Sequence, residues 1–223
     1  MTAAIDRLDE SLAAATPDLD DEGRRLALAL FRRLATGEPA QIDNLVAETG
    51  LSLDAAEERL ATWPGVFRDE RGDVVGFWGI AVPEMDHRLR VGDGPGVHAW
   101  CAWDPMFLAP IVGDAEVETH DPVTGETIRY RVGDDGIHDL SHHGSVVSFL
   151  SPDGTWDADI VTSFCHYVRH FTSAATGENW VAEHPGTFLL TVHEAAELGR
   201  RHAGRLRGDA AGSTAQEAAT VPA

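Results

Sequence analysis

The residues best suited to chemistry are a thiol and a carboxylate three positions apart, Cys101 and Asp104. They lie in an apolar stretch rich in tryptophan, and Cys101 is one of only two cysteines in the chain. If this stretch is helical, the two side chains share a face and can exchange a proton, because residues i and i+3 of a helix are neighbours. Pro105 favours the first turn of a helix, so the alternative is a turn at the helix start.

The second cysteine, Cys165, lies in the segment from Ile160 to Phe171. Two thiols are a soft ligand set that suits Cu(I), Zn or heavier group 12 ions. Two cysteines and one aspartate are too few for a structural zinc site, and neither cysteine belongs to a C-x-x-C pair. Each thiol alone is more typical of a buried core residue. A metal site built from both would be open to substrate.

Composition excludes several classes of function. The chain has 223 residues, 43% of them hydrophobic, which is enough for one large or two small folded domains. A net charge of −20 disfavours nucleic acid and anionic membranes as partners. Every basic residue is arginine, which excludes chemistry that needs lysine. With no apolar run long enough to span a bilayer and no signal-peptide pattern, we expect a cytoplasmic protein with free thiols.

The N-terminal part is predicted to be helical. Residues 1–22 form a peripheral helix and an acidic linker, and residues 23–80 form a winged-helix-like domain. Gly50 suits a helix stop and Ser52 an N-cap. The helix in the DNA-reading position carries three carboxylates against one arginine, so we expect a packing role rather than DNA binding. The predicted elements of this domain are helices Leu26–Leu34, Ile42–Glu48 and Leu53–Thr62, followed by a β-hairpin over Gly65–Phe77.

The region 81–203 is predicted to be a mixed α/β domain with antiparallel strands, which makes the whole chain an α+β protein. Beyond about Gly204 the tail lacks an apolar period, and we expect residues 204–223 to be disordered. The elements predicted in the α/β domain are a hairpin of Ala115–Thr119 with Thr127–Val132, strands Ser145–Leu150 and Ile160–Phe171, a helix around Glu178–Glu183, and a terminal helix after Phe188.

Four segments, in this order and spacing, resemble the alkylmercury lyases, the organomercurial lyases of bacterial mercury resistance. The resemblance spans roughly residues 80 to 200, with weaker motifs in the N-terminal helices. The segments are Ala99–Asp104, Ser163–Phe171, Glu178–Trp180 and Val192–Gly199.

The resemblance implies protonolysis of a carbon–mercury bond, which gives a hydrocarbon and Hg(II). Cys101 and Cys165 would be the ligands of the substrate's mercury, and Asp104 would carry the proton. No bound cofactor is implied; free thiols would accept Hg(II), which would pass to a mercuric reductase. The chemistry is reasonable, because a carboxylate beside a thiol can accept its proton as mercury binds and return it to the leaving carbon.

The chain departs from the family at two positions. Many relatives carry further cysteines where this chain has Asp121 and His166. Neither position belongs to the implied triad, so their absence bears on extra thiol help with product handover and not on the core reaction.

Two rival functions stay open at the level of sequence. A non-catalytic protein could sequester Hg(II) or Cu(I) with both thiols, in which case Asp104 is dispensable. An acidic winged-helix regulator could sense metal through the same thiols, although its charge opposes DNA binding. Several other side chains have structural roles by default, with Trp100, Trp103 and Phe107 as core or as walls of an apolar pocket, and His142-His143, His166 with His170, and His193-Glu194 as weak candidates for function.

Overall fold

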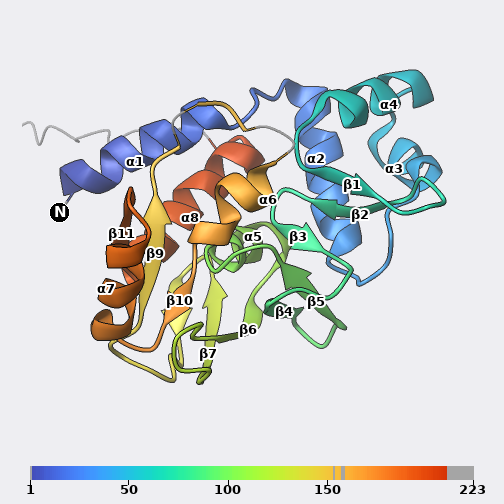
Figure 1. Cartoon of the computed structure of the whole chain (residues 1–223). Helices are drawn as coiled ribbons and strands as arrows, with labels where there is room; N and C mark the ends of the chain where they lie inside the picture. Colours follow the sequence, from blue (N-terminus) through green and yellow to red (C-terminus); the bar gives the residue numbers. More distant parts are fainter. Residues whose placement is uncertain (1, 153, 157–158, 210–223) are drawn as a thin grey trace, which may run out of the picture.

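The fold begins with a helical layer that leads into a β-hairpin (Figure 1). The computed structural model describes residues 2–152, 154–156 and 159–209. The elements of the first part are α1 (Thr2–Ala15), α2 (Asp21–Leu34), α3 (Ile42–Thr49), α4 (Leu53–Thr62), β1 (Val66–Arg68) and β2 (Val74–Phe77). The three helices α2, α3 and α4, together with the hairpin of β1 and β2, confirm the winged-helix-like prediction for this part of the chain.

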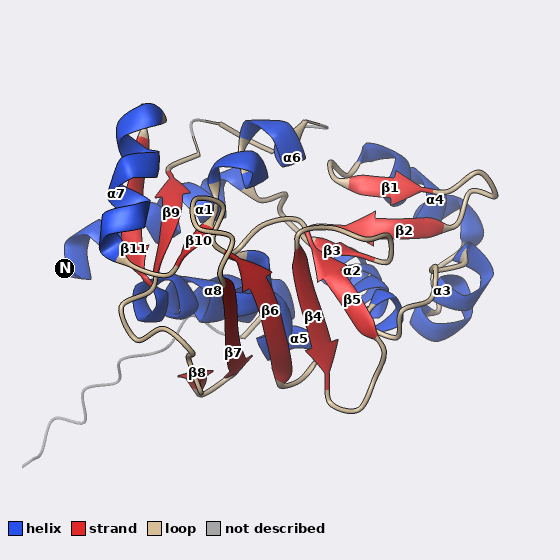
Figure 2. Cartoon of the chain, turned by 60° about the horizontal axis from the view of Figure 1, so that its bottom comes forward, coloured by secondary structure: helices blue, strands red, loops and turns tan. Residues whose placement is uncertain are grey.

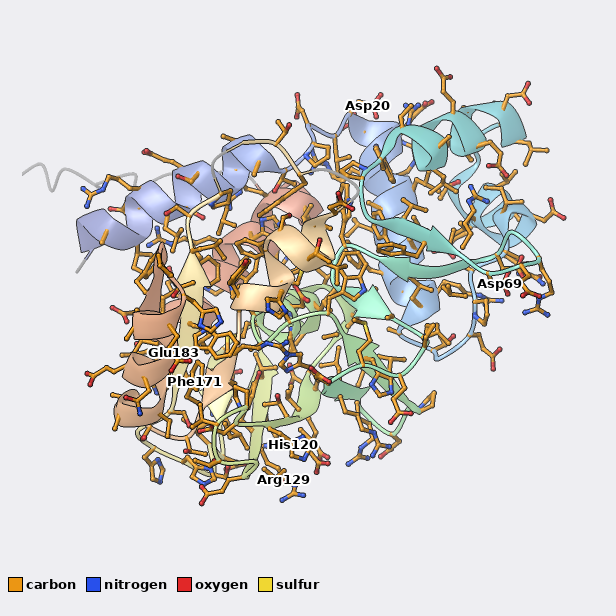
Figure 3. All side chains as sticks on the ribbon, in the orientation of Figure 1. Asp20, Asp69, His120, Arg129, Phe171 and Glu183 are labelled. Carbon is orange, nitrogen blue, oxygen red and sulfur yellow. The ribbon has the colours of Figure 1, made fainter. Side chains whose placement is uncertain are left out.

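The helix ends of this part follow from local side chains. Asp20, at the start of α2 in Figure 3, accepts a hydrogen bond from the Gly23 N–H, and α2 therefore begins earlier than its apolar pattern suggested. Ser52 caps α4 in the same way, as predicted. Gly50 ends α3 with a φ of 74°, a conformation that glycine adopts without strain.

The prediction that the first helix is peripheral is wrong. Leu8 and Leu12 of α1 are buried, and α1 lies along the C-terminal helix (Figure 1). The Ala15 carbonyl at its end accepts a hydrogen bond from the Trp156 N–H. An amphipathic pattern with three apolar side chains on one face buries that face wherever a partner helix is available.

One antiparallel sheet joins the hairpin to the second part of the chain (Figure 2). Its order is β1-β2-β3-β5-β4-β6-β7-β8, so the sheet runs without a break past residue 80. The predicted hairpin of β6 with β7 is confirmed, while the division into domains at residue 80 stays a prediction. The further strands of this sheet are β3 (Ile80–Ala81), β4 (His87–Val91), β5 (Gly96–Ala99), β6 (Ala115–His120), β7 (Thr127–Gly133) and β8 (Gly136–His138).

A second, three-stranded sheet of order β10-β9-β11 lies beside the first. The prediction of a strand at β9 is confirmed, and α7 begins earlier than expected because Ser173 caps it. The elements are β9 (Val146–Leu150), β10 (His170–Phe171), α7 (Ala174–Glu183) and β11 (Thr187–Thr191).

Two helices form the centre of the core. The apolar helix α5 (Asp104–Val112) packs on the inner face of the large sheet, and α8 (Val192–Arg207) packs on α5. A Cβ at Gly199 would lie 2.6 Å from backbone atoms of Met106, so only glycine permits this close approach. Glu194 completes a capping box with Thr191, which supports its predicted structural role.

Two predictions for the C-terminal half are wrong. The segment Ile160–Phe171 is not one strand, because it forms α6 (Ile160–Ser163), a 3₁₀ turn (Cys165–Tyr167) and only then β10. Phe164 and Cys165 are therefore both buried, whereas a strand would have placed them on opposite faces. The terminal helix continues to Arg207, so residues 204–207 are helical; the rest of the predicted tail, residues 210–223, lies outside the described residues.

Candidate active site

Cys101 and Asp104 meet in a turn between β5 and α5. Asp104 is the first residue of the helix and Pro105 the second, so Cys101 lies before the helix begins. One Asp104 carboxylate oxygen, Oδ2, accepts a hydrogen bond from the Cys101 N–H at 2.7 Å. The helical-face interpretation is thus wrong and the turn alternative is correct. The turn fixes the carboxylate directly beside the thiol.

The second thiol reaches the same place from the 3₁₀ turn. The Ala102 N–H donates to the Val168 carbonyl at 3.2 Å, which joins the two cysteine-bearing segments. The Cys101 and Cys165 sulfurs and an Asp104 carboxylate oxygen all lie within 4.8 Å of one another. All three side chains are buried, and Cys101 is 0% exposed. The structure therefore brings together the three residues proposed from sequence.

Burial is the largest influence on the pKa values of Asp104 and Cys101, and the hydrogen bond between the thiols is the largest for Cys165. Burial raises the pKa of Asp104 to about 7, against the hydrogen bonds from the Cys101 N–H and thiol and the Trp100 N–H. Burial, together with the hydrogen bond between the two thiols, raises the pKa of Cys101 well above the usual thiol range. That same hydrogen bond lowers the pKa of Cys165, but burial and the Asp104 charge outweigh it. At neutral pH both thiols carry protons and Asp104 can accept one.

A two-residue turn between β2 and β3 presses against Asp104. Gly79 has a φ of 95°, and a Cβ there would lie 2.7 Å from the Asp104 carboxyl carbon. Trp78 also has a positive φ, 35°, which is rare for an aromatic residue. The backbone of both residues suits a tight hairpin turn, and the Trp78 indole N–H is held by the Pro64 carbonyl at 2.7 Å. The turn between β2 and β3 thus supplies one wall of the site.

An apolar cavity of about 40 Å³ opens onto Asp104 and Cys165. Both roles considered for the three aromatic residues, core packing and pocket wall, are confirmed. All three are buried and also line this cavity, namely Trp100, Trp103 and Phe107. Cys101 does not line it. The cavity's other lining residues are Thr16, Trp78, Gly79, Trp156, Ile160, Phe164 and His202.

The sequence did not point to five of these lining residues, which are Thr16, Trp78, Gly79, Trp156 and His202. No local pattern connects them, because they come from the residue after α1, the turn between β2 and β3, a loop and α8. His202 is buried against Trp103 and Phe107, with ring centroids 5.3 and 5.0 Å away, and burial lowers its pKa to about 3. Neutral at physiological pH, it adds a polar atom to an otherwise apolar pocket.

The two positions of departure lie outside the triad. Asp121 is buried and accepts hydrogen bonds from the N–H groups of Val123, Thr124 and Thr172. His166 is exposed on the 3₁₀ turn, with its ring 5.1 Å from that of Tyr167. Asp121 therefore has a structural role here that a thiol could not perform.

Fold and site together define a class of protein with two buried thiols, a ligand set suited to a soft metal, beside a carboxyl group able to carry a proton. The chain belongs to the alkylmercury lyase family: the family's own domain model matches residues 80–204, and the model of its helix-turn-helix domain matches residues 5–78.

Characterised relatives agree with this assignment. The chain is 34% identical over 173 residues to an alkylmercury lyase of Staphylococcus epidermidis, covering 77% of this chain and 78% of that protein. It is 31% identical over 196 residues to one of Pseudomonas putida, covering 87% and 91%. A crystal structure of the mercury-bound form of MerB2 has the same fold, with a TM-score of 0.73 at 21% identity, covering 91% of this chain and 98% of that one.

Proposed function

We propose that Cys101, Asp104 and Cys165 carry out the cleavage of a carbon–mercury bond. The observation that supports this most directly is the buried Asp104 carboxyl, whose pKa of about 7 lets it accept and return a proton beside two protonated thiols. A sequestration protein needs the two sulfurs alone and has no use for a carboxyl poised in this way. The geometry therefore favours catalysis over storage of mercury.

The first step is capture of the substrate's mercury. An organomercury cation enters the cavity, and a thiol transfers its proton to the Asp104 carboxylate as its sulfur bonds mercury. A thiolate on mercury raises the electron density at the attached carbon. The aromatic walls of the cavity hold the organic group, and their burial excludes water.

The second step is protonolysis. Asp104 gives its proton to the carbon, the electron pair of the carbon–mercury bond stays with that carbon, and the hydrocarbon leaves. The second thiol releases its proton to solvent as it bonds Hg(II), so that mercury is held by both Cys101 and Cys165. Each turnover thus consumes two thiol protons, of which one leaves in the hydrocarbon.

The cycle closes outside the protein. We propose that free thiols remove Hg(II) without any bound cofactor, and that the metal then passes to a mercuric reductase. Among the described residues, no helix has both the length and the apolar character needed to cross a bilayer. Acting in the cytoplasm is part of the same proposal, because free thiols stay reduced there.

The test is benzene release from phenylmercury with excess thiol. The unmodified protein should release benzene, and the variants Cys101→Ser, Cys165→Ser and Asp104→Ala should each lose the activity by at least about a hundredfold. Asp139→Asn, which changes an exposed carboxylate paired with Arg131, is the control and should be fully active. Tight mercury binding without benzene, equal in Asp104→Ala, would support sequestration instead.

A further inference from the structure

A second polar cluster lies on the inner face of the large sheet and contains no residue of the cavity wall. His87, Thr119 and Tyr130 come from the neighbouring strands β4, β6 and β7, and His170 comes from β10. All four are at most 2% exposed. His87 and Thr119 share a hydrogen bond of 2.7 Å, and the ring centroids of Tyr130 and His170 are 5.4 Å apart. Four polar side chains thus meet inside the core.

Most of the polar atoms in this cluster have no protein partner among the described residues. These atoms are His87 Nε2, the Tyr130 hydroxyl, and both ring nitrogens of His170. Burying such groups unpaired is costly, because they lose their hydrogen bonds to water, whereas apolar residues of the same shape would carry no such cost. Side chains of this kind are suited to bind small hydrogen-bonding molecules, of which water is the simplest.

The cluster lies next to Cys101. In the sheet, His87 pairs with Ala99, two residues before Cys101. His170 follows Val168, whose carbonyl accepts the hydrogen bond from Ala102. After burial itself, the charges of Cys101 and Asp104 are the next causes that raise the pKa of Tyr130. The Tyr130 hydroxyl is therefore within electrostatic reach of the triad.

Cys101 needs such a neighbour because it is fully buried and does not line the cavity. Once mercury leaves, both cysteine thiolates must regain a proton, and Asp104, the acid beside them, can supply only one of the two. Neutral imidazole can accept a proton at one nitrogen and donate from the other, and a phenol can do both through one oxygen. Burial keeps His87 and His170 in that neutral form.

We propose that His87, Tyr130 and His170, with water bound between them, return a proton to Cys101 at the end of each turnover. This inference rests on the proposed function. Two external thiolates take Hg(II) from Cys101 and Cys165, and the two cysteine thiolates take up two protons from solvent, one of them through this cluster. Charge and atoms balance, and no oxidant or reductant is needed.

The outer end of the route lies at the C-terminal end of β6, an interior strand of the sheet. His120, at the end of β6, is exposed (Figure 3), and its charge acts on His87. The charges of Asp121 and His142 act on His170 in the same way. Protons from solvent thus meet titratable groups before they reach the buried cluster.

The test separates one turnover from many. Tyr130→Phe removes a single oxygen atom, and Tyr167→Phe, at the chain's other tyrosine, is the matched control. With protein in excess over phenylmercury, benzene formation should stay within about twofold of the unmodified rate, because the first protons come from the thiols. With excess phenylmercury and thiol, the steady-state rate of Tyr130→Phe should fall about tenfold. The control should change neither rate.

A second measurement does not depend on carbon–mercury cleavage. Each protein is loaded with Hg(II) and mixed with excess dithiothreitol, and the ultraviolet absorbance of the thiolate–mercury bonds is followed. Removal should be slower in Tyr130→Phe, with a larger solvent deuterium isotope effect, because an unprotonated Cys101 recaptures mercury. His170→Gln should behave similarly and serves if Tyr130→Phe does not fold.

Two results would overturn the proposal. Equal loss in single and multiple turnovers would mean that Tyr130 acts in cleavage or only supports the fold. Unchanged steady-state and mercury-removal rates would mean that no proton passes through the cluster. If the unmodified protein releases no benzene at all, the proposed function fails, while mercury removal still tests the proton route.

Discussion

The two cysteines share one site but are held in opposite ways. Cys101 lies in a turn whose backbone N–H groups are held by Asp104 and Val168, and it has no contact with the cavity. Cys165 lies on a short 3₁₀ turn and lines the cavity. One thiol is thus fixed beside Asp104, and the other faces the cavity in which we propose that the organic group binds. The division of tasks follows from the two segments and not from the thiols themselves.

The largest effect should come from Gly79→Ala, which should displace the Asp104 carboxylate from its place beside Cys101. The new Cβ would lie 2.7 Å from the Asp104 carboxyl carbon, so the carboxylate must move. A displacement of that kind can reduce benzene release by about a hundredfold. Gly72→Ala is the control, since Gly72 has a similar φ of 89° but nothing within 4 Å of its Cβ position.

Both variants should lose roughly 1–2 kcal/mol of stability to the unfavourable backbone conformation, as measured by denaturant unfolding. Both variants should thus lose a similar amount of stability, but only Gly79→Ala should also lose benzene-releasing activity. If both variants kept full activity, the close contact at Asp104 would have no catalytic importance.

A smaller effect is expected from pH. Asp104 must be ionised to accept a thiol proton, and its pKa is raised to about 7. The kcat/KM for phenylmercury should therefore rise about tenfold per pH unit up to pH 7 and then level off. No fall should follow near pH 8.5, because the pKa values of both thiols are raised as well. A rate that is flat from pH 5 to 8 would contradict the role of Asp104.

The smallest effect should be a difference in labelling between the two thiols. With a bulky arylating reagent at neutral pH, Cys165 should react severalfold faster than Cys101, since only Cys165 lines the cavity. Mass spectrometry of digested protein after partial labelling gives the ratio directly. Faster labelling of Cys101 would contradict this account, because it would make Cys101 the more accessible of the two thiols.

The turn that carries Cys101 and Asp104 could be predicted from the sequence better than the segment that carries Cys165. The Cys101–Asp104 pair is identifiable from its spacing, and Pro105 raises a turn as the alternative to the helical face, which the structure shows to be correct. Cys165 was identified through family resemblance, but its segment was predicted as a strand. The alternation of apolar and polar side chains there is equally compatible with short helical turns once Phe164 packs on Phe149 and Trp156.

The cavity wall and the buried polar cluster could not be predicted, for a different physical reason. Thr16, Trp78 and His202 meet only because α1 packs on α8, α8 packs on α5, and the turn between β2 and β3 lies against Asp104 at the start of α5. His87 and His170 lie on strands of different sheets, with no sequence pattern to join them. Contacts between distant segments depend on tertiary packing. The local periodicity that predicts helices and hairpins does not predict such contacts.

The most direct measurement of the central claim is an infrared titration of the Asp104 carboxyl. In the difference between the unmodified protein and Asp104→Asn, a protonated carboxyl band should be present at pH 5 and disappear with a midpoint near 7. This result would establish a buried carboxyl able to carry the proton between thiol and carbon. A carboxylate that is already fully ionised at pH 5 would contradict the account, because Asp104 could not then hold the proton for the leaving carbon.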